Sequence, residues 1–516
     1  MSIHSSPCRF CIVTVAALLI AAPTAAQPPA ASHALRWQIP VLDPPAPIGK
    51  DEYAARRMVL MDALGEGVLL VPGAPPPAAD YLPFHQSAAF RYLTGITEPG
   101  AALVMQWSGG RVQEWLFVQR VDPAREVWEG ARLGPDSAAA LTGIPALTSD
   151  RITVVLDSLL QGAATFFVTA VPPESPGALA ALDYEQQVIA RTIERRPGIR
   201  VRDASNILAG LRARKSPAEL DLIRRAVYIT AAAHREAMKV ARPAMNEFEI
   251  RALIEYVFAR NGAEAPAFAS IVGSGPNTTT LHYNADDRFI RDSDLLLMDV
   301  GASYGGYAAD VTRTIPAAGG FTREQRDIYE IVLAAQKAAE QRLRPGAEWQ
   351  ELRDAANGEI AAGLARLRLI DSPDATYDCG EQQCPQYRLF FMHGLGHGVG
   401  LDVHDPDISS FEGFQPGSAV TIEPGIYVRR DVLDHLADTP ANRAMIERLR
   451  PALARYADIG VRIEDVYLFG PDGVERASAG VPREPDEVQL LMREASAMAE
   501  DRRGDVVSWY RSLRRH

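Results

Sequence analysis

Apolar residues recur with the period of an α-helix in four stretches of the second half of the chain. Three of these stretches begin with a capping box, in which Ser216, Asn246 or Thr322 is followed three residues later by Glu or Gln. Such a pair satisfies backbone N–H groups that are otherwise free at a helix start, so each box indicates where a helix begins. The pattern predicts helices over residues 217–240, 247–261, 323–343 and about 347–367.

Strand-like runs follow each predicted pair of helices. Residues 295–300 and 418–423 are short and mostly apolar, and residues 461–464 alternate between apolar and charged side chains. The order helix, helix, strands therefore occurs twice, in residues 217–315 and again in 323–470. This order predicts a curved antiparallel sheet with helices on its outer face, whose strands direct side chains into one central cavity.

Residues 51–206 alternate strand-like and helix-like segments, which predicts an α/β domain. Its strands are expected at Gly67–Pro72, in a hairpin of 101–106 with 114–119 across Ser108-Gly109-Gly110, at 154–156 and at 165–168. Because its ionisable residues show few suggestive spacings, we interpret this domain as one that shapes or assembles the protein. Residues 205–216 are the predicted junction with the second half.

The N-terminus has the pattern of a secretory signal peptide. Arg9 is its only charged side chain, residues 11–22 are apolar, and small residues follow up to Ala26. The apolar run is too short to span a membrane, although an uncleaved anchor is the alternative. We therefore expect residues 1–26 to be removed on export to the periplasm or the exterior. Residues 27–50 are rich in Pro and Ala and are expected to form a disordered lead-in.

Composition limits the partners of this chain. With 516 residues it is too long for one core, so two or three domains are expected. Its net charge of −12 argues against nucleic acid or an anionic membrane as the main partner. No apolar run after the signal approaches ~20 residues, so no membrane segment is expected in the mature protein. Of the four cysteines, Cys379 and Cys384 remain after export and are expected to form a local disulfide.

Two aspartates flank a glycine-rich turn in the predicted sheet. Asp299 ends an apolar strand, and Asp310 follows Tyr307 after the turn. A hairpin centred between Tyr304 and Gly305 would set Asp299 opposite Asp310, with Cβ atoms about 4.5–5.5 Å apart. Two such carboxylates repel each other unless one takes a proton or a cation lies between them. The alternative is that both aspartates cap or flank the turn.

A run of histidines and glycines, residues 390–405, adds imidazoles to these carboxylates. His393, His397 and His404 are separated by glycines at every second position, which excludes a zinc-binding helix because glycine weakens helices. We expect extended or looping backbone, with the glycines leaving room for a ligand. Glu423 and Glu464 each end a further strand. Four carboxylates and one imidazole suit two bridged divalent ions such as Mn²⁺, Co²⁺ or Zn²⁺ better than one.

At these residues the chain resembles the pita-bread metallopeptidases, and within them aminopeptidase P and prolidase. The matching motifs are Gly273-Ser-Gly-Pro-Asn277 with His282, Met298-Asp299-Val-Gly, Gly306-Tyr-Ala-Ala-Asp310, Met392-His393-Gly to His404-Asp, Ile422-Glu423-Pro-Gly and Gly460-Val-Arg462-Ile-Glu464-Asp. Residues 90–99 and 127–130 also resemble the N-terminal domain of the aminopeptidase P branch. The resemblance implies an α+β chain, with a creatinase-like α/β domain over 51–206 and a pita-bread domain over 215–495.

The resemblance also implies roles for single residues. Five metal ligands are implied, with one metal on Asp299, bridges at Asp310 and Glu464, and the other metal on His397 and Glu423. Glu423 also matches the residue that transfers protons. His282, His393, His404 and Arg462 match residues around the substrate proline and the reacting carbonyl. Two divalent ions are implied, Mn²⁺ first among them.

The implied activity is removal of the N-terminal residue from peptides with proline at position two. An Xaa-Pro dipeptidase is the alternative, and a non-catalytic pita-bread binding protein or a metal-free creatinase-like hydrolase is disfavoured because all five ligand positions are filled. A homodimer or homotetramer is expected. Two features depart from the family pattern: Val466 follows Asp465 where a second aspartate is common, and the segments 371–387 and 429–459 are expected to rim the cavity.

Overall fold

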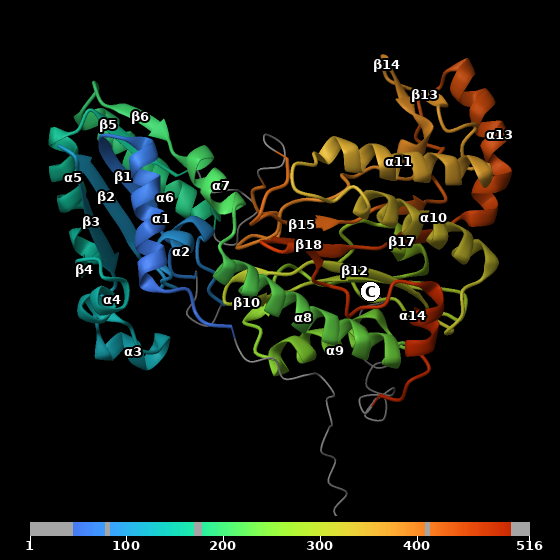
Figure 1. Ribbon diagram of the computed structural model, residues 1–516, viewed down its shortest axis with the longest axis horizontal. Helices are drawn as coiled ribbons and strands as arrows, with labels where there is room; N and C mark the ends of the chain where they lie inside the picture. Colours follow the sequence, from blue (N-terminus) through green and yellow to red (C-terminus); the bar gives the residue numbers. More distant parts are fainter. Residues whose placement is uncertain (1–44, 78–82, 170–177, 408–412, 497–516) are drawn as a thin grey trace, which may run out of the picture. The chain divides into compact units, whose positions relative to one another are not determined.

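A six-stranded mixed sheet organises the N-terminal region, residues 50–213, in the order β4-β3-β2-β1-β5-β6 (Figure 1). The computed structural model describes residues 45–77, 83–169, 178–407 and 413–496. The predicted signal peptide and most of the lead-in lie outside these residues. The strands are β1 (Gly67–Pro72), β2 (Ala102–Ser108), β3 (Arg111–Val118), β4 (Ala146–Thr148), β5 (Thr165–Val168) and β6 (Arg200–Asp203).

Strand β1 is buried along its whole length because helices cover both faces of this sheet. Leu69 and Val71 point to one core, which α1, α2, α4 and α7 complete, while Val68 and Leu70 point to another, which α5 and α6 complete. The helices are α1 (Lys50–Leu64), α2 (Ala88–Thr94), α3 (Pro123–Glu129), α4 (Gly134–Thr142), α5 (Ile152–Gly162), α6 (Ala178–Arg195) and α7 (Ser205–Ala213). The α/β prediction for this region is therefore confirmed.

One strand prediction in this region is wrong. Residues 154–156 lie within helix α5, because Leu156 and Leu160, four residues apart, are both buried against the sheet. The predicted junction also proves to be mostly helical, since α7 covers Ser205–Ala213. The exact domain limits at 206 and 215 stay predictions.

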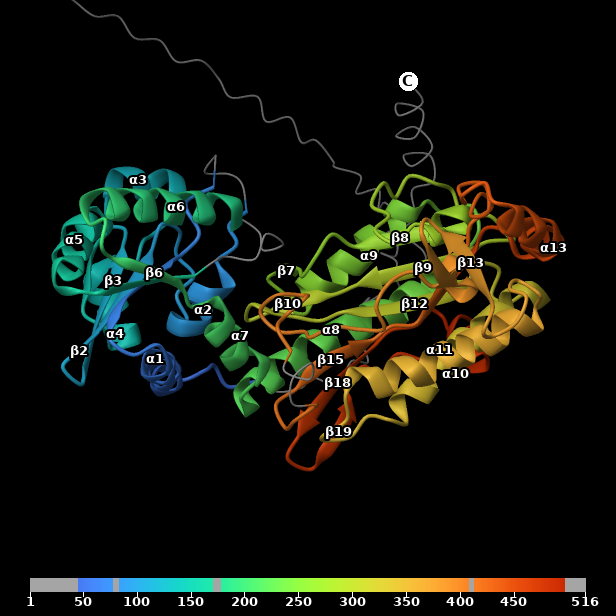
Figure 2. The same ribbon diagram turned by 90° about the horizontal axis from the view of Figure 1, so that it is seen from above.

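The three capping boxes of the C-terminal region, residues 217–491, are all present. In each, the cap side chain accepts a backbone N–H, and the Glu or Gln three residues on accepts the N–H of the cap residue. The helices are α8 (Pro217–Val240), α9 (Glu247–Arg260), α10 (Arg323–Glu340), α11 (Trp349–Arg366), α13 (Pro440–Tyr456) and α14 (Pro485–Leu491). Helices α8 and α9 contact β8, β10 and β12, whereas α10 contacts β15, β16 and β17. Figures 1 and 2 show α8 with α9 and α10 with α11 as two separate helix pairs.

The strands of the C-terminal region are short and pair in antiparallel fashion. They are β7 (Ala265–Pro266), β8 (Ile271–Ser274), β9 (Leu295–Val300), β10 (Ala302–Tyr304), β11 (Tyr307–Ala308), β12 (Val311–Pro316), β13 (Thr376–Cys379), β14 (Gln382–Pro385), β15 (Ala419–Ile422), β16 (Gly425–Val428), β17 (Ile459–Arg462), β18 (Asp465–Gly470) and β19 (Gly473–Arg476). The two helix-strand halves join where Glu464 N–H donates to the Thr312 carbonyl at 3.0 Å. This junction brings residues far apart in sequence onto one surface.

The predicted hairpin register is wrong by two residues. Asp299 pairs with Thr312, not with Asp310, because the turn is Gly305-Gly306 and Tyr304 pairs with Tyr307. Both glycines have positive φ, at 58° and 83°, the conformation that tight hairpin turns favour and that other residues rarely adopt. Asp310 consequently lies two residues before the partner of Asp299, next to it on the diagonal rather than directly opposite.

The segments that depart from the family pattern pack on each other. Cys379 and Cys384 form the predicted disulfide, at the end of the β13–β14 hairpin. Asn442 of α13 holds this hairpin, because its side chain accepts the Asp378 N–H at 3.0 Å and donates to the Asp378 carbonyl at 3.0 Å. Within the described residues, no helix is long and apolar enough to cross a membrane.

Candidate metal centre

Three predicted ligands from distant parts of the chain lie within reach of a single ion. One ligand atom each from Asp310, His397 and Glu464 falls within 4.8 Å of the others. Asp310 directly precedes β12, and Glu464 lies in the link between β17 and β18. His397 comes from the histidine run. The geometry is the kind that a divalent cation needs, since carboxylate and imidazole ligands can reach it from three sides.

The other two predicted ligands adjoin this group. Glu423 Oε1 lies 3.5 Å from His397 Nε2, and Asp310 Oδ2 lies at the same distance from that nitrogen. Asp299 forms an ion pair with Arg462, and its charge also raises the pKa of Asp310. All five predicted ligands are therefore neighbours around one space.

The available lone pairs fit a cation. Asp299 Oδ1 and Asp310 Oδ1 are buried and have no hydrogen-bond partner among the described residues. An unpaired buried carboxylate oxygen is costly, so it normally has a partner, and a cation is the partner that this group lacks. His397 Nδ1 lies 2.9 Å from its acceptor, the carbonyl of Gly398, and therefore carries the proton. Its Nε2 lone pair is left to face the carboxylates, as metal binding requires.

The pKa values of the carboxylates indicate mutual repulsion. Burial, followed by repulsion from Glu464, raises the pKa of Asp310 well above its usual range, and the same two causes act on Glu423. Burial and the charge of Asp299 raise the pKa of Glu464 to about 8. Positive charge at the centre would remove this conflict, whereas the His397 imidazole does not supply it because burial lowers its pKa to about 4.

A chain of hydrogen bonds runs from Asp299 to His393. Arg462 pairs with Asp299 and donates from Nη1 to the Tyr427 hydroxyl at 2.9 Å. That hydroxyl lies 2.8 Å from His393 Nε2, and His393 Nδ1 lies 2.7 Å from the Gly394 carbonyl. His393 therefore carries its proton on Nδ1 and accepts from Tyr427. Burial lowers its pKa to about 4, so it stays neutral and borders the site as a fixed, uncharged ring.

The remaining predicted residues lie at the exposed side. His404 is exposed, and its ring contacts that of His397 with centroids 4.4 Å apart. His282 is also exposed and interacts electrostatically with His393. Both side chains are therefore accessible to solvent. His393, by contrast, is held by its neighbours on two sides.

Two residues of the site were missed in the sequence. Tyr427 links Arg462 to His393, and the Thr312 hydroxyl donates to Glu464 Oε2 at 2.7 Å while accepting from Arg462 Nε at 3.1 Å. Alternation offered a signal for both. Thr312 stands two residues after Asp310, and Tyr427 stands four residues after Glu423, so the period of two along a strand places each on the face of a predicted ligand.

The glycines of the histidine run have a different role from the one expected. A Cβ on Gly396 would collide with the Thr421 carbonyl, and a Cβ on Gly400 would lie 2.5 Å from Asp405 Oδ2. Gly398 meets the carbonyl of Asp405 in the same way. Only at Gly394 is the space open. These glycines therefore allow the chain to pack on itself, and only Gly394 leaves room for a ligand.

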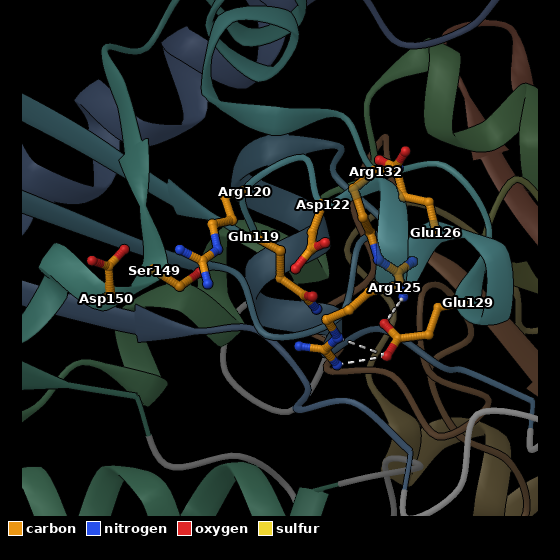
Figure 3. Close-up of a pocket in the computed structure, with 9 residues that line it drawn as sticks. All are labelled: Gln119, Arg120, Asp122, Arg125, Glu126, Glu129, Arg132, Ser149 and Asp150. Atoms are coloured by element: carbon orange, nitrogen blue, oxygen red, sulfur yellow. Dashed lines mark hydrogen bonds and ion pairs between the residues drawn. The ribbon is translucent and has the colours of Figure 1, made fainter.

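A polar cavity lies in the N-terminal region, with a volume of about 420 Å³. Figure 3 shows its charged side chains, and among them Arg125 and Arg132 both bind Glu129. Carboxylates and arginines are interspersed in its lining, and no group of metal-ligating side chains occurs there among the described residues. This cavity is therefore not a second candidate for the metal centre.

Both regions match described families. Residues 221–470 match "Metallopeptidase family M24", and residues 53–168 match "Aminopeptidase P, N-terminal domain". The Xaa-Pro aminopeptidase of Escherichia coli (strain K12) is 33% identical over 464 residues, which cover 86% of this chain and 98% of that protein. Human Xaa-Pro aminopeptidase 3 is 30% identical over 421 residues, which cover 80% of this chain and 78% of that protein.

Solved structures give the same relation. Aminopeptidase P from E. coli with the inhibitor Pro-Leu matches with a TM-score of 0.72 and 33% identity, covering 87% of this chain and 99% of that one. Proline aminopeptidase P II from Yersinia pestis matches with a TM-score of 0.73 and 32% identity, covering 86% and 99%. A zinc-substituted form of the E. coli protein in complex with product is also similar, with a TM-score of 0.72.

Proposed function

The chain belongs to metallopeptidase family M24, and we propose that it is an Xaa-Pro aminopeptidase, which hydrolyses the bond before a proline at position two of a peptide. One observation carries this proposal: Asp310, His397 and Glu464 converge within 4.8 Å in a chain that covers 98% of an Xaa-Pro aminopeptidase. The convergence supplies the chemistry of a metallo-exopeptidase, and the relatives supply the substrate class.

Divalent metal ions belong to this family, and the donor set fits two of them. Asp299, Asp310, His397, Glu423 and Glu464 would hold the pair, for which we propose Mn²⁺, with Co²⁺ or Zn²⁺ also compatible with these ligands. When bound, such ions lower the pKa of a water molecule toward neutrality and polarise a carbonyl oxygen. Total metal analysis of the purified protein tests the number and identity of the ions.

Glu423 is the residue we assign to proton transfer. Burial and the charge of Glu464 raise its pKa well above the usual range, the direction that favours a carboxyl group as a proton donor as well as an acceptor. It would take a proton from the attacking water and give one to the proline nitrogen. That nitrogen carries no hydrogen in the peptide and must be protonated before it leaves.

The exposed histidines and the Arg462 chain supply binding. His404 would donate a hydrogen bond to the oxygen that becomes negative in the transition state. His282, His393 and Arg462 would surround the proline ring, and the hydrogen bond from Tyr427 keeps the His393 ring fixed. The apolar proline ring of the substrate would pack favourably on the fixed, uncharged imidazole of His393.

Substrate length separates the two peptidase activities. Xaa-Pro-Yaa tripeptides and Xaa-Pro dipeptides should be offered to the metal-loaded protein at equal concentration. We expect the tripeptides to be cleaved with release of the first residue. Cleavage of dipeptides alone would instead identify an Xaa-Pro dipeptidase.

We also propose that the protein is exported and forms homo-oligomers. Residues 1–26 support export, and N-terminal sequencing of the mature protein from an export-competent host should begin near Gln27. Exposed apolar side chains in the N-terminal region support self-association, since Val127 and Trp128 are 80% and 77% exposed. Light scattering after gel filtration should give the mass of a dimer or a tetramer.

A further inference from the structure

The loop that joins His397 to His404 is folded around the side chain of Asp405. Asp405 N–H donates to the Gly398 carbonyl at 2.9 Å, and Asp405 Oδ1 accepts the Asp402 N–H at 3.1 Å. Gly400 packs directly on the Asp405 carboxylate, where a Cβ would lie 2.5 Å from Oδ2. Asp405 therefore fills the centre of the loop, and the position of both histidines depends on it.

Two cations from outside the loop hold this carboxylate. Arg212, at the end of α7, pairs with Asp405 Oδ1, and Lys215 Nζ lies 2.9 Å from Asp405 Oδ2. Arg212 also pairs with Asp402 at 2.6 Å. We call Arg212, Lys215 and Asp405 the Asp405 clamp.

The clamp is buried and balanced in charge. Its three residues are 4%, 5% and 6% exposed, and Asp402 supplies the second negative charge against the two cations. Burial opposes ionisation of Asp405, but the charges of Arg212 and Lys215 outweigh it and hold its pKa below the usual range. Burial of an ionic group costs free energy unless the group is fully paired. Removal of one member of the clamp therefore leaves an unpaired buried charge, which favours a shift of the loop toward solvent.

The clamp also connects the histidine loop to the N-terminal region. Leu401 packs against the core that contains Leu60 and Phe90, and α7 is anchored there because the Tyr92 hydroxyl donates to the Leu211 carbonyl at 3.1 Å. On its other side, the Gly400 carbonyl accepts the Ala308 N–H at 2.7 Å, close to Asp310. The loop is thus held between α7 and the hairpin that carries two of the proposed ligands.

We propose that Arg212 and Lys215 are positioning residues for the reaction, which set the placement of His404 and His397 through the Asp405 carboxylate. Neither side chain is assigned a contact with substrate or metal. The proposal rests on the proposed function only for the role of His404, since the placement of the loop is a structural claim in itself. It gives the N-terminal region a part in catalysis through α7.

Arg212→Met is the principal test, with Arg57→Met as its matched control. Arg57 is 2% exposed and binds Glu114 and the Leu93 carbonyl within the N-terminal region. Both changes therefore remove one buried arginine together with its ion pairing, which involves two carboxylates at Arg212 and one at Arg57. With a Xaa-Pro-Yaa tripeptide and Mn²⁺, we expect kcat to fall by about 10–100-fold in Arg212→Met, with KM changed by less than about 3-fold. Arg57→Met should retain the kcat of the unmodified protein.

Two further variants keep the test decisive. Lys215→Met should also lower kcat. This variant tests the proposal if Arg212→Met does not fold. Arg212→Lys retains the charge with a shorter reach and should recover part of the loss. Equal kcat values in Arg212→Met, Lys215→Met and Arg57→Met would overturn the proposal.

A spectroscopic measurement separates the clamp from the proposed function. NMR of the full-length protein with labelled histidine, assigned by His404→Gln, should show the His404 and His397 ring resonances shifted in Arg212→Met and unchanged in Arg57→Met. This result is expected even if the unmodified protein fails to cleave Xaa-Pro peptides, which would contradict the proposed function alone. Unchanged resonances in Arg212→Met would overturn the clamp whatever the activity.

Discussion

Glu464 and Asp465 are adjacent in sequence and both are buried, at 2% and 0% exposure, yet they lie in opposite electrostatic surroundings. Burial and the charge of Asp299 raise the pKa of Glu464 to about 8. Burial acts on Asp465 too, but the charges of Arg313 and Arg483 outweigh it, so its pKa lies below the usual range. One carboxylate faces the metal centre and the other faces a cluster of cations.

The cation cluster satisfies every oxygen of Asp465. Oδ1 accepts from Arg313 at 2.6 Å and from Ser478 at 2.5 Å, while Oδ2 accepts from Arg483 at 3.0 Å and from Gln336 at 3.0 Å. Arg313 also donates to the Glu464 carbonyl at 2.6 Å. The cluster therefore holds the backbone of Glu464 in place, while the Glu464 side chain remains in an acidic group.

This difference separates a structural site from a functional one. Two arginines hold the pKa of Asp465 below its usual range, whereas at the metal centre Arg462 pairs with Asp299 and the pKa values of Asp310, Glu423 and Glu464 remain raised. Functional sites commonly retain such unsatisfied charge at a cost in stability. Four experiments would test or refine the comparison.

Removal of the proton-transfer group should have the largest effect. We expect Glu423→Ala to reduce kcat by about 10²–10⁴-fold, the usual contribution of a general acid-base group, together with the loss of one proposed ligand. Turnover of a Xaa-Pro-Yaa tripeptide measures this, with circular dichroism as the check on folding. Full activity in a protein stripped of metal would exclude the proposed centre.

The structural carboxylate should show the reverse profile. Asp465→Asn leaves Arg313 and Arg483 without their shared charge, so we expect the free energy of unfolding to fall by about 3–5 kcal/mol. Urea unfolding measures it. Asp310→Asn removes a repelling charge instead and should leave the metal-stripped protein as stable or more stable. A large loss of stability in Asp310→Asn would remove the contrast between the two sites.

The pH dependence of the metal-stripped protein offers the third test. Glu464 has its folded pKa raised from 4.5 to about 8, so its contribution to stability is present at low pH and is lost as pH rises toward 8. Burial lowers the pKa of His393 and His397 to about 4. These two histidines therefore make the free energy of unfolding increase with pH, but only below about pH 6.5. Between pH 6.5 and 8 we therefore expect the free energy of unfolding to decrease.

A variant and a metal titration identify the source of that slope. Glu464→Gln should flatten it, because the amide does not titrate. Addition of Mn²⁺ should release protons in the same pH range, which calorimetry in buffers of different ionisation enthalpy detects. A slope that persists in Glu464→Gln would assign the effect to Asp310 or Glu423.

The smallest expected effect concerns Thr312, which was missed in the sequence. Its hydroxyl orients Glu464, so Thr312→Val should weaken metal binding by about 10–100-fold, as loss of a residue that orients a ligand commonly does. Thr312→Ser keeps the hydroxyl and is the control. Calorimetric titration with Mn²⁺ compares the two, and equal affinities would show that Glu464 needs no such support.

Most residues of the site could be named from the sequence, but their positions relative to one another could not be predicted. Acids at strand ends and three histidines in a glycine run indicated the kinds of ligand, the family resemblance selected His397 among the histidines, and the structure brings the five residues together. The predicted hairpin register is wrong by two residues because Gly305 and Gly306, both with positive φ, form the turn. The sequence alone does not determine which two neighbouring positions adopt this conformation. Residues 154–156 were assigned to a strand because short apolar runs occur in both helices and strands.

Features that depend on neighbours along the chain could be predicted from the order of amino acids. The capping boxes, the apolar alternation and the local disulfide each involve residues within a few positions, so their patterns are directly visible. The pairing of the buried charges, in contrast, is visible only in the folded protein. Asp465 meets Arg313 from 152 residues away, and Arg212 meets Asp405 across 193. No local pattern predicts pairs so far apart in sequence, because they result from packing of the whole chain. These pairs distinguish a carboxylate in a salt bridge from one at the metal centre.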